Sequence, residues 1–240
     1  MTGHKLDKKV KHKSDDSITN IHDYDVDVKA NHIYLTGNPD YIISADDTSE
    51  PGVEYTMSSK FIKNMNILMR TNPDQPIVIH MKTCGGDWSE GMAIHNMIKS
   101  CPVPVTILSY THARSMSSII FQAANKRVMM PDSYFMIHDG TYGIEGTVKQ
   151  VNSSITFDNK SENRMLDIYA ESLVRNGKFK GADRKRIKKH LRHLMDKKED
   201  VFFTAKEALE YGFCDEIFGE TMNFDWSKLT EYTDEQLRRG

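Results

Sequence analysis

The sequence predicts an α/β fold in which short apolar strands alternate with helices. Two β-type runs, PIVIHMK at 76–82 and VPVTILSY at 103–110, flank a segment whose apolar residues recur at helical spacing. Two further apolar runs follow, RVMM at 127–130 and SYFMIH at 133–138. Strands that alternate with helices in this way are typical of a largely parallel sheet with helices on its faces.

The helix between the first two runs is indicated by a single apolar stripe. Ile94, Met97, Ile98 and Cys101 stand at positions i, i+3, i+4 and i+7, which lie on one face of a helix. Together with its flanking strands, this helix completes a β-α-β unit. A further helix is predicted over SMSSIIFQAANK at 115–126.

The N-terminal part divides into a charged tail and the start of a folded domain. Residues 1–22 contain few apolar side chains, so they cannot bury enough surface to offset the entropy of ordering, and we expect a flexible tail. HIYLTG at 32–37 predicts a strand, and residues 53–69 predict a helix that stops at Asn72-Pro73. No Pro-, Gly- or Ser-rich linker divides the remainder, so residues 23–240 are predicted to form one domain.

A long helix is predicted after the glycines of segment 140–146. Thr147 is a suitable N-cap for it, and Asn176-Gly177 is a suitable stop. Asp183 can cap a second helix that is rich in basic residues, and AKEALEYG at 205–212 predicts a last helix before the short strand FCDEIF. The apolar residues on one face of the long helix are Val148, Val151, Ile155, Leu166, Tyr169 and Leu173.

Charge and composition limit the classes of function. The chain has 32 Lys and Arg against 34 Asp and Glu, so it offers no global attraction for nucleic acid, and the basic segment 184–193 is more typical of a solvated helix face. No apolar run reaches the roughly 18 residues of a membrane span, and the N-terminus lacks the apolar core of a signal peptide. The cysteines, Cys84, Cys101 and Cys214, have no metal-binding or C-x-x-C spacing. We therefore expect a cytoplasmic protein with reduced thiols, no membrane association and no metal or organic cofactor.

Three residues have the chemistry of a serine hydrolase. Ser115 follows an apolar strand and opens a helix, a position where a side chain stands beside unpaired N–H groups. His138 closes SYFMIH and is a candidate base, and Asp200 is a candidate to orient that histidine if the fold brings it there. The N–H groups of Met116 and of Gly85-Gly86 are candidates to hold an oxyanion.

Each of these features also has an ordinary structural interpretation. A serine at a helix start is more often an N-cap, a glycine pair is more often a turn, and an aspartate before an apolar run often caps the next helix. Cys84 is expected to be a neutral neighbour of the glycines, because no base is placed for a thiol mechanism. The residue types alone therefore leave the catalytic set open.

Four motifs in one order resemble the ClpP family of serine peptidases. The family has Asn-Ser-Pro-Gly-Gly, then Gly-x-Ala-x-Ser-Met, then Met-Ile-His, then Asp-x-Phe before a helix that ends in Glu-Tyr-Gly. The corresponding segments here are MKTCGG (81–86), THARSMSS (111–118), FMIHDG (135–140) and EDVFFTAKEALEYGFCDEIF (199–218). Several motifs in one order are far more specific than any one of them.

The resemblance implies a ClpP/crotonase-like spiral of β-α-β units with a long protruding handle helix, the handle segment covering about residues 147–195. It implies that Ser115 is the nucleophile, His138 the general base and Asp200 the residue that orients it. It also implies an oxyanion hole formed by the N–H groups of Gly86 and Met116, with Gly85 beside them.

A ClpP-like chain would be an ATP-independent peptidase subunit that cleaves unfolded proteins or peptides through an acyl-enzyme. The resemblance further implies a self-compartmentalised homo-oligomer, in the family a ring, and by analogy an AAA+ unfoldase as partner. Two alternatives stay open at this point. One is a crotonase-type acyl-CoA enzyme, which shares the spiral fold, and the other is a catalytically inactive ring component.

Departures from the family pattern mark the chain as a divergent member. Thr83-Cys84 replaces Ser-Pro before the glycines, and Thr111 and Arg114 stand where small residues are usual beside the nucleophile. A bulky cation at this place is expected to alter substrate choice. A basic insertion, RKRIKKHLRH at 184–193, lengthens the handle segment.

Overall fold

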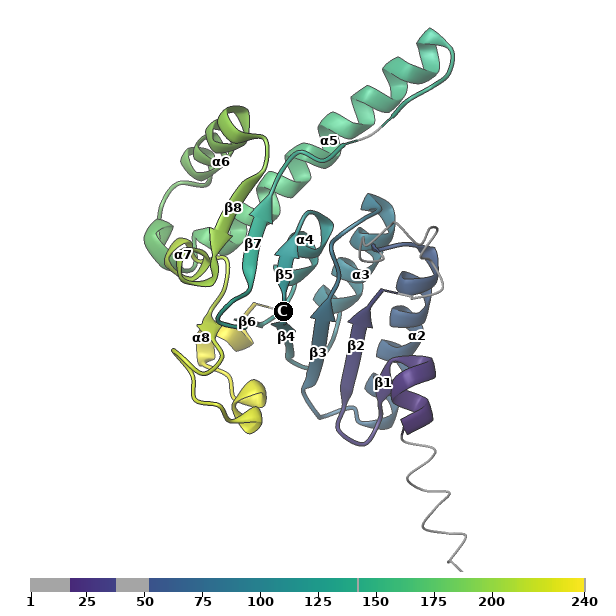
Figure 1. Ribbon diagram of the computed structural model, residues 1–240, viewed down its shortest axis with the longest axis vertical. Coiled ribbons are helices and arrows are strands. Elements are labelled where there is room, and N and C mark those ends of the chain that lie inside the picture. Colours follow the sequence, from purple (N-terminus) through teal and green to yellow (C-terminus); the bar gives the residue numbers. More distant parts are fainter. Residues whose placement is uncertain (1–17, 38–51, 142, 240) are drawn as a thin grey trace, which may run out of the picture.

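The computed structural model describes residues 18–37, 52–141 and 143–239, and its strands form two sheets. The strands are β1 (Val26–Asp27), β2 (His32–Thr36), β3 (Ile77–Lys82), β4 (Val105–Ser109), β5 (His112–Arg114), β6 (Lys126–Met129), β7 (Tyr134–Ile137), β8 (Val201–Thr204) and β9 (Glu216–Ile217). The larger sheet has the order β1-β2-β3-β4-β6-β9 and is parallel except for the β1–β2 pair (Figure 1). The predicted α/β class is confirmed.

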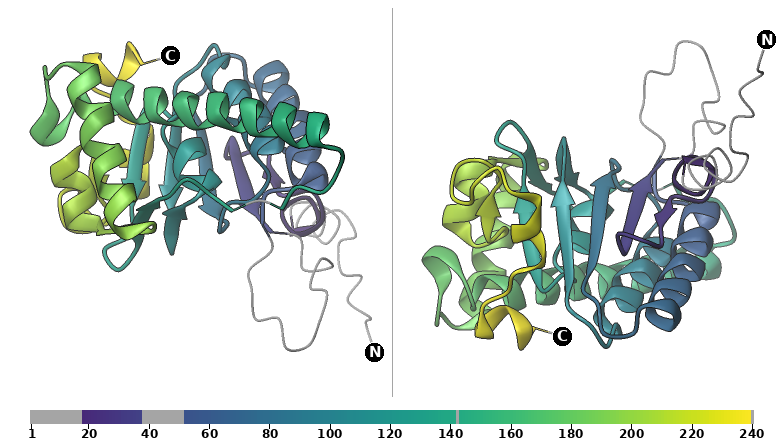
Figure 2. Two further views of the ribbon diagram at one scale, coloured as in Figure 1. Left: turned by 90° about the horizontal axis from the view of Figure 1, so that it is seen from above. Right: turned by 90° about the horizontal axis from the view of Figure 1, so that it is seen from below.

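Helices cover one face of the larger sheet. The helices are α2 (Tyr55–Thr71), α3 (Trp88–Lys99), α4 (Met116–Phe121), α5 (Val148–Leu173), α6 (Arg184–Lys198), α7 (Ala205–Tyr211) and α8 (Asp234–Leu237), with 3-10 turns η2 (Gly177–Phe179) and η3 (Trp226–Thr230). Figure 2 shows α2 and α3 side by side against this sheet. The opposite face carries a smaller apolar cluster in which Val78 and Leu108 pack with Phe218 and Leu229 of the C-terminal segment.

The central strands follow the burial that a covered parallel sheet requires. Ile33, Ile79 and Ile107 stand opposite one another across β2, β3 and β4, and all three side chains are buried. β3 and β4 are buried at nearly every position, including the polar His80, Thr106 and Ser109, because both of their faces are covered. β2 instead alternates buried and partly exposed residues, as expected for a strand with one solvated face.

The smaller sheet was not expected from the sequence. Its order is β5-β7-β8, with β5 parallel and β8 antiparallel to β7. SYFMIH therefore does not extend the main parallel sheet, and the segment VFFT forms a strand that the pattern did not predict. Phe203 is buried on its core face whereas Phe202 is 56% exposed, an alternation that four residues show too briefly to be recognised in advance.

Two predicted boundaries are wrong. The helix expected over 115–126 ends at Phe121, because the Asn125 side chain accepts a hydrogen bond from Val105 N–H and the chain turns into β6. The tail expected over 1–22 is helical from residue 18, since residues 18–24 form a helix, and residues 1–17 lie outside the described residues.

The long helix α5 begins at the predicted cap. Thr147 and Gln150 form a capping box, in which each side chain bonds to the other residue's backbone N–H. The C-terminal half packs on the core through Leu166 and Tyr169, whereas the N-terminal half projects beyond the body of the molecule (Figure 1). The predicted apolar stripe is therefore buried in one half and leaves Val148 77% exposed in the other.

The basic helix α6 begins at the predicted cap Asp183 and packs along α5. Its cations meet carboxylates of α5 in three ion pairs, Arg184–Glu171, Lys188–Asp167 and Arg192–Glu162. Three of the cations of the basic segment are therefore engaged within the chain.

Two features concern the surroundings of the protein. None of the described helices is both long enough and apolar enough to cross a membrane. Cys84, Cys101 and Cys214 all lie in the described part of the chain, and no disulfide joins them.

Candidate active site

Ser115, His138 and Asp200 lie side by side at one end of the small sheet. Ser115 Oγ is 2.8 Å from His138 Nε2, and His138 Nδ1 is 3.1 Å from Asp200 Oδ1. In this order a histidine can take a proton from the hydroxyl while the carboxylate holds the ring in place. The structure therefore brings together the three residues singled out in the sequence.

The pairing of β7 with β8 places the histidine against the aspartate. Ile137 stands opposite Val201 in this antiparallel pair, so the next residue of β7 and the preceding residue of β8 are neighbours, and these are His138 and Asp200. Glu199 adopts a positive φ of 59°, which ends α6 and turns the chain into β8. Side-chain exposure is 18% for His138 and 48% for Asp200, so the pair can be reached from solvent.

Ser115 occupies a sharp turn between β5 and α4. Its backbone has φ 52° and ψ −133°, a region that residues with a Cβ seldom adopt. Its N–H donates to the carbonyl of Met136 on β7, which ties the turn to the strand leading to His138. A strand-to-helix turn of this kind presents a nucleophile clear of the sheet. We refer to residues 114–118 as the elbow.

Two buried hydroxyls hold the elbow in this conformation. Ser117 Oγ accepts a hydrogen bond from Arg114 N–H at 2.9 Å and donates to the Arg114 carbonyl at 2.7 Å. Ser118 Oγ donates to the Ser115 carbonyl and lies 2.6 Å from the hydroxyl of Tyr169, whose pKa is raised by complete burial. Sequence reasoning missed these supporting residues, and the only signal for them was the run of small residues in SMSS.

Gly85 and Gly86 pack directly against the elbow. Gly85 has φ 97°, and a Cβ there would lie 2.7 Å from Met116 N and 2.8 Å from Ser115 Cβ. A Cβ on Gly86 would collide with the backbone of Val53, so both positions require glycine. Among the described residues, no group accepts a hydrogen bond from Gly86 N–H or Met116 N–H. These two donors are thus available beside the Ser115 hydroxyl.

A second carboxylate near the imidazole is already neutralised. Asp139 directly follows His138, and both of its oxygens accept hydrogen bonds from Arg192 of α6 at 2.8 and 2.9 Å. Asp200 is therefore the carboxylate that contacts the imidazole. Over the described ranges, no group of three or more His, Cys, Asp or Glu side chains is arranged to hold a metal ion.

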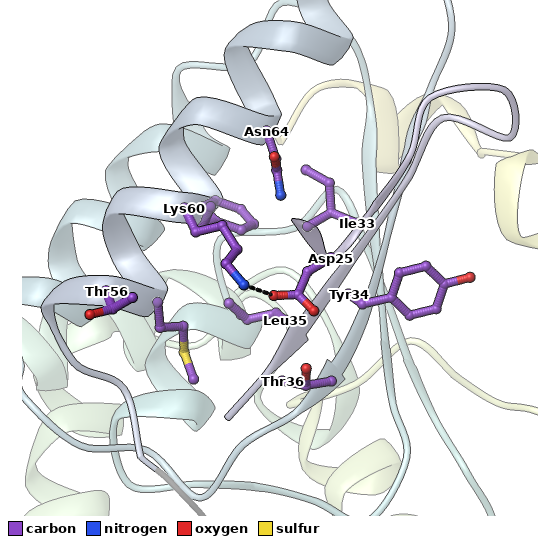
Figure 3. A pocket seen from close by; sticks show the side chains of 10 residues that line it. Asp25, Ile33, Tyr34, Leu35, Thr36, Thr56, Lys60 and Asn64 are labelled. Atoms are coloured by element: carbon purple, nitrogen blue, oxygen red, sulfur yellow. Dashed lines mark hydrogen bonds and ion pairs between the residues drawn. The ribbon is translucent and has the colours of Figure 1, made fainter. Parts of the chain in front are cut away.

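A separate hollow lies between α2 and the strands β1 and β2, away from the elbow (Figure 3). It encloses only about 20 Å³ and contains the ion pair between Lys60 and Asp25, at 2.8 Å. The ring of Tyr34 points away from it. A hollow of this size is too small for an organic ligand and is a gap in the packing.

The comparisons with known proteins agree with the fold and the motifs. Residues 13–221 match the family model of Clp protease. The chain is 28% identical over 171 residues to an ATP-dependent Clp protease proteolytic subunit of Deinococcus radiodurans, a match that covers 70% of this chain and 78% of the relative. It is 30% identical over 173 residues to the subunit of Streptococcus suis (70% and 82% covered) and 31% identical over 173 residues to subunit 1 of Chlamydia abortus (70% and 83%). The chain therefore belongs to the Clp protease family of serine peptidases.

Proposed function

We propose that this chain hydrolyses peptide bonds through a covalent acyl-enzyme on Ser115. The observation that carries the proposal is the continuous hydrogen-bonded series Ser115–His138–Asp200 beside two unused N–H donors. His138 Nε2 accepts the Ser115 proton as Oγ attacks the carbonyl carbon, and it then gives that proton to the leaving amine. A water molecule, which gives a proton to His138, then attacks the acyl-enzyme ester in the same way. This step releases the carboxylic acid product and returns the proton to Ser115.

The remaining groups of the site have supporting roles in this mechanism. Asp200 accepts from His138 Nδ1–H, which fixes the tautomer that leaves Nε2 free to take a proton. The N–H groups of Gly86 and Met116 are donors for the oxyanion of the tetrahedral intermediate. Gly85 keeps the space in front of Met116 N open.

The proposed hydrolysis itself consumes only water, so the subunit cleaves accessible peptides without ATP. The relatives are named subunits of ATP-dependent proteases. We assign any ATP requirement of this chain to a separate AAA+ unfoldase that would deliver unfolded protein to it.

The projecting half of α5 supports a homo-oligomer. Val148, Ile155 and Phe157 are 77%, 40% and 58% exposed, although each is a large apolar side chain. Exposed apolar side chains on a projecting helix are characteristic of a surface that another subunit covers. We propose that copies of this chain associate through this part of α5 into an assembly that encloses their active sites.

Reaction with a fluorophosphonate tests the catalytic proposal. The full chain is expected to be labelled at a single site, to lose labelling in Ser115→Ala, and to cleave an unstructured protein. Ser153→Ala removes an exposed serine of α5 and serves as the matched control that keeps its label. A wild-type chain that is unlabelled in every assembly state would indicate the inactive ring component. Binding of acyl-CoA that is indifferent to Ser115→Ala would indicate the crotonase-type enzyme.

A further inference from the structure

We infer that Arg114 determines substrate specificity by binding an acidic side chain within two residues of the cleaved bond. The inference rests on the proposed peptidase function and names a substrate class for the same site. Arg114 is the last residue of β5 and directly precedes the nucleophile.

Arg114 lies on the same face of the small sheet as the catalytic groups. It stands opposite Met136 on β7, which in turn stands opposite Phe202 on β8, so these three side chains form one row. The next row on that face contains His138, two residues after Met136 on β7, and Asp200, two residues before Phe202 on the antiparallel β8. Rows on one face are separated by about 7 Å. An arginine side chain can span this distance, so its charge lies within reach of substrate residues beside the cleaved bond.

The backbone of Arg114 is held in place while its charged group is left without a partner. Ser117 bonds to both its N–H and its carbonyl, which restricts the strand end on which the side chain is mounted. The Nε atom is buried and has no hydrogen-bond partner. Within the described part of the chain, no carboxylate forms an ion pair with Arg114, although Arg192 on the other side of the site is paired with Asp139.

Arg114 is only partly buried and its guanidinium forms no ion pair with a described residue, and a carboxylate is the group that best satisfies a guanidinium. The neighbouring residues of this row, the buried Met136 and the exposed Phe202, are both uncharged and so supply no partner for Arg114. In the next row, which contains His138 and Asp200, the carboxylate of Asp200 is already engaged with His138. A glutamate or aspartate of the substrate would therefore meet an unpaired cation.

Matched peptides test this assignment on the full chain in its assembled state. Internally quenched peptides that differ only by Glu or Gln at each of the two positions before and after the cleaved bond are compared by kcat/KM, with the bond identified by mass spectrometry. We expect a Glu/Gln ratio of about ten at one position, in the range of a charge-assisted hydrogen bond, and a smaller ratio at high salt. The ratio should approach one in Arg114→Ala and in Arg114→Gln, remain partly in Arg114→Lys, and fall below one in Arg114→Glu.

Arg184→Ala serves as the control, because it removes an arginine that pairs with Glu171 at the α5–α6 contact, and it should keep the wild-type ratio. An unchanged Glu/Gln ratio in Arg114→Ala and Arg114→Gln, with cleavage and fluorophosphonate labelling intact, would overturn the inference and leave the peptidase proposal standing. If Arg114→Ala changed the native mass of the assembly but not the Glu/Gln ratio, the inference would also be overturned, since Arg114 would then pair with a carboxylate of a second copy. If the wild-type chain showed neither fluorophosphonate labelling nor cleavage, the proposed function would be contradicted, and the inference with it.

Discussion

The hydroxyl of Tyr169, on α5, lies 2.6 Å from Ser118 Oγ, three residues after Ser115 in the elbow. Ser118 gives its single proton to the Ser115 carbonyl, so Tyr169 must be the donor in the bond between the two hydroxyls. The buried C-terminal half of α5 is thus connected to the Ser115 carbonyl through two consecutive hydrogen bonds. The strained backbone of Ser115 is held partly from α5.

Removal of the Tyr169 hydroxyl should weaken the elbow. We expect Tyr169→Phe to lower the free energy of unfolding by about 1–2 kcal/mol, because a buried hydrogen bond is lost while the ring remains, and to slow labelling of Ser115. Urea unfolding and the labelling rate are the measurements. Tyr169→Phe should cost much less in a Ser118→Ala background, and equal costs in the two backgrounds would contradict the connection.

A methyl group at Gly85 should block the proposed oxyanion site. Because the added Cβ would lie 2.7 Å from Met116 N and the residue has φ 97°, we expect Gly85→Ala to reduce kcat/KM by at least about 100-fold. Gly143→Ala is the matched control, since no atom lies within 4 Å of a Cβ at that position. Circular dichroism verifies that both variants are folded. A Gly85→Ala variant that is folded and labelled at the wild-type rate would contradict the assigned oxyanion site.

Asp200, and not a neighbouring acid, should be needed for catalysis. Asp200→Asn removes the acceptor for His138 Nδ1–H and favours the wrong tautomer, so we expect kcat to fall by roughly three to four orders of magnitude. Asp196→Asn changes an exposed acid on α6 and should stay within about twofold of the wild type. Steady-state cleavage of a peptide measures both, and equal losses in the two variants would argue against Asp200.

Stability should fall when the pH drops below about 6.5. Burial, with the neighbouring His32, lowers the pKa of His80 to about 4, and burial is also the main cause that lowers the pKa of His95 to about 4. Between pH 6.5 and 4 the unfolded chain binds protons at these positions that the folded chain does not, so the folded state loses up to about 3 kcal/mol for each histidine over this window.

Urea unfolding at pH 7.5, 6 and 5 measures this loss, and His95→Gln should make the decline shallower because it removes one of the two buried imidazoles. Equal free energies of unfolding for the wild type at pH 7.5 and 5 would contradict the prediction.

Charges on the projecting part of α5 should dissociate the assembly. Val148→Glu combined with Ile155→Glu places carboxylates where two apolar side chains are exposed, so we expect a smaller native mass at an unchanged melting temperature of the subunit. Lys160→Glu changes the charge of the same helix without removing an apolar group and should keep the wild-type mass. Light scattering or native mass spectrometry is the measurement, and equal masses for all three proteins would contradict an interface on this half of α5.

Short-range signals identified much of the fold and part of the site. The apolar runs at β3 and β4, the stripe of α3 and the caps Thr147 and Asp183 each depend on residues a few positions apart, and the structure has them where the pattern placed them. Ser115 was recognised by the same means, because a strand followed by a helix start is a local signal. His138, Gly85 and Gly86 were candidates on the same local grounds, whereas the choice of Asp200 and the family rested on the four motifs.

The way in which distant segments meet depends on tertiary packing. Asp200 contacts His138 because β8 pairs antiparallel with β7 in a particular register, and a shift by one residue would turn its carboxylate to the opposite face. Packing between elements far apart in the chain likewise decides three other features. These are the support of the elbow by Tyr169, the division of α5 into a buried and an exposed half, and the absence of an ion-pair partner for Arg114 among the described residues. Local sequence was enough to indicate most of the elements and the residue types that could do chemistry, since backbone conformation and side-chain periodicity are short-range properties. Their assembly into one site depended on long-range strand pairing and burial, which no short segment encodes.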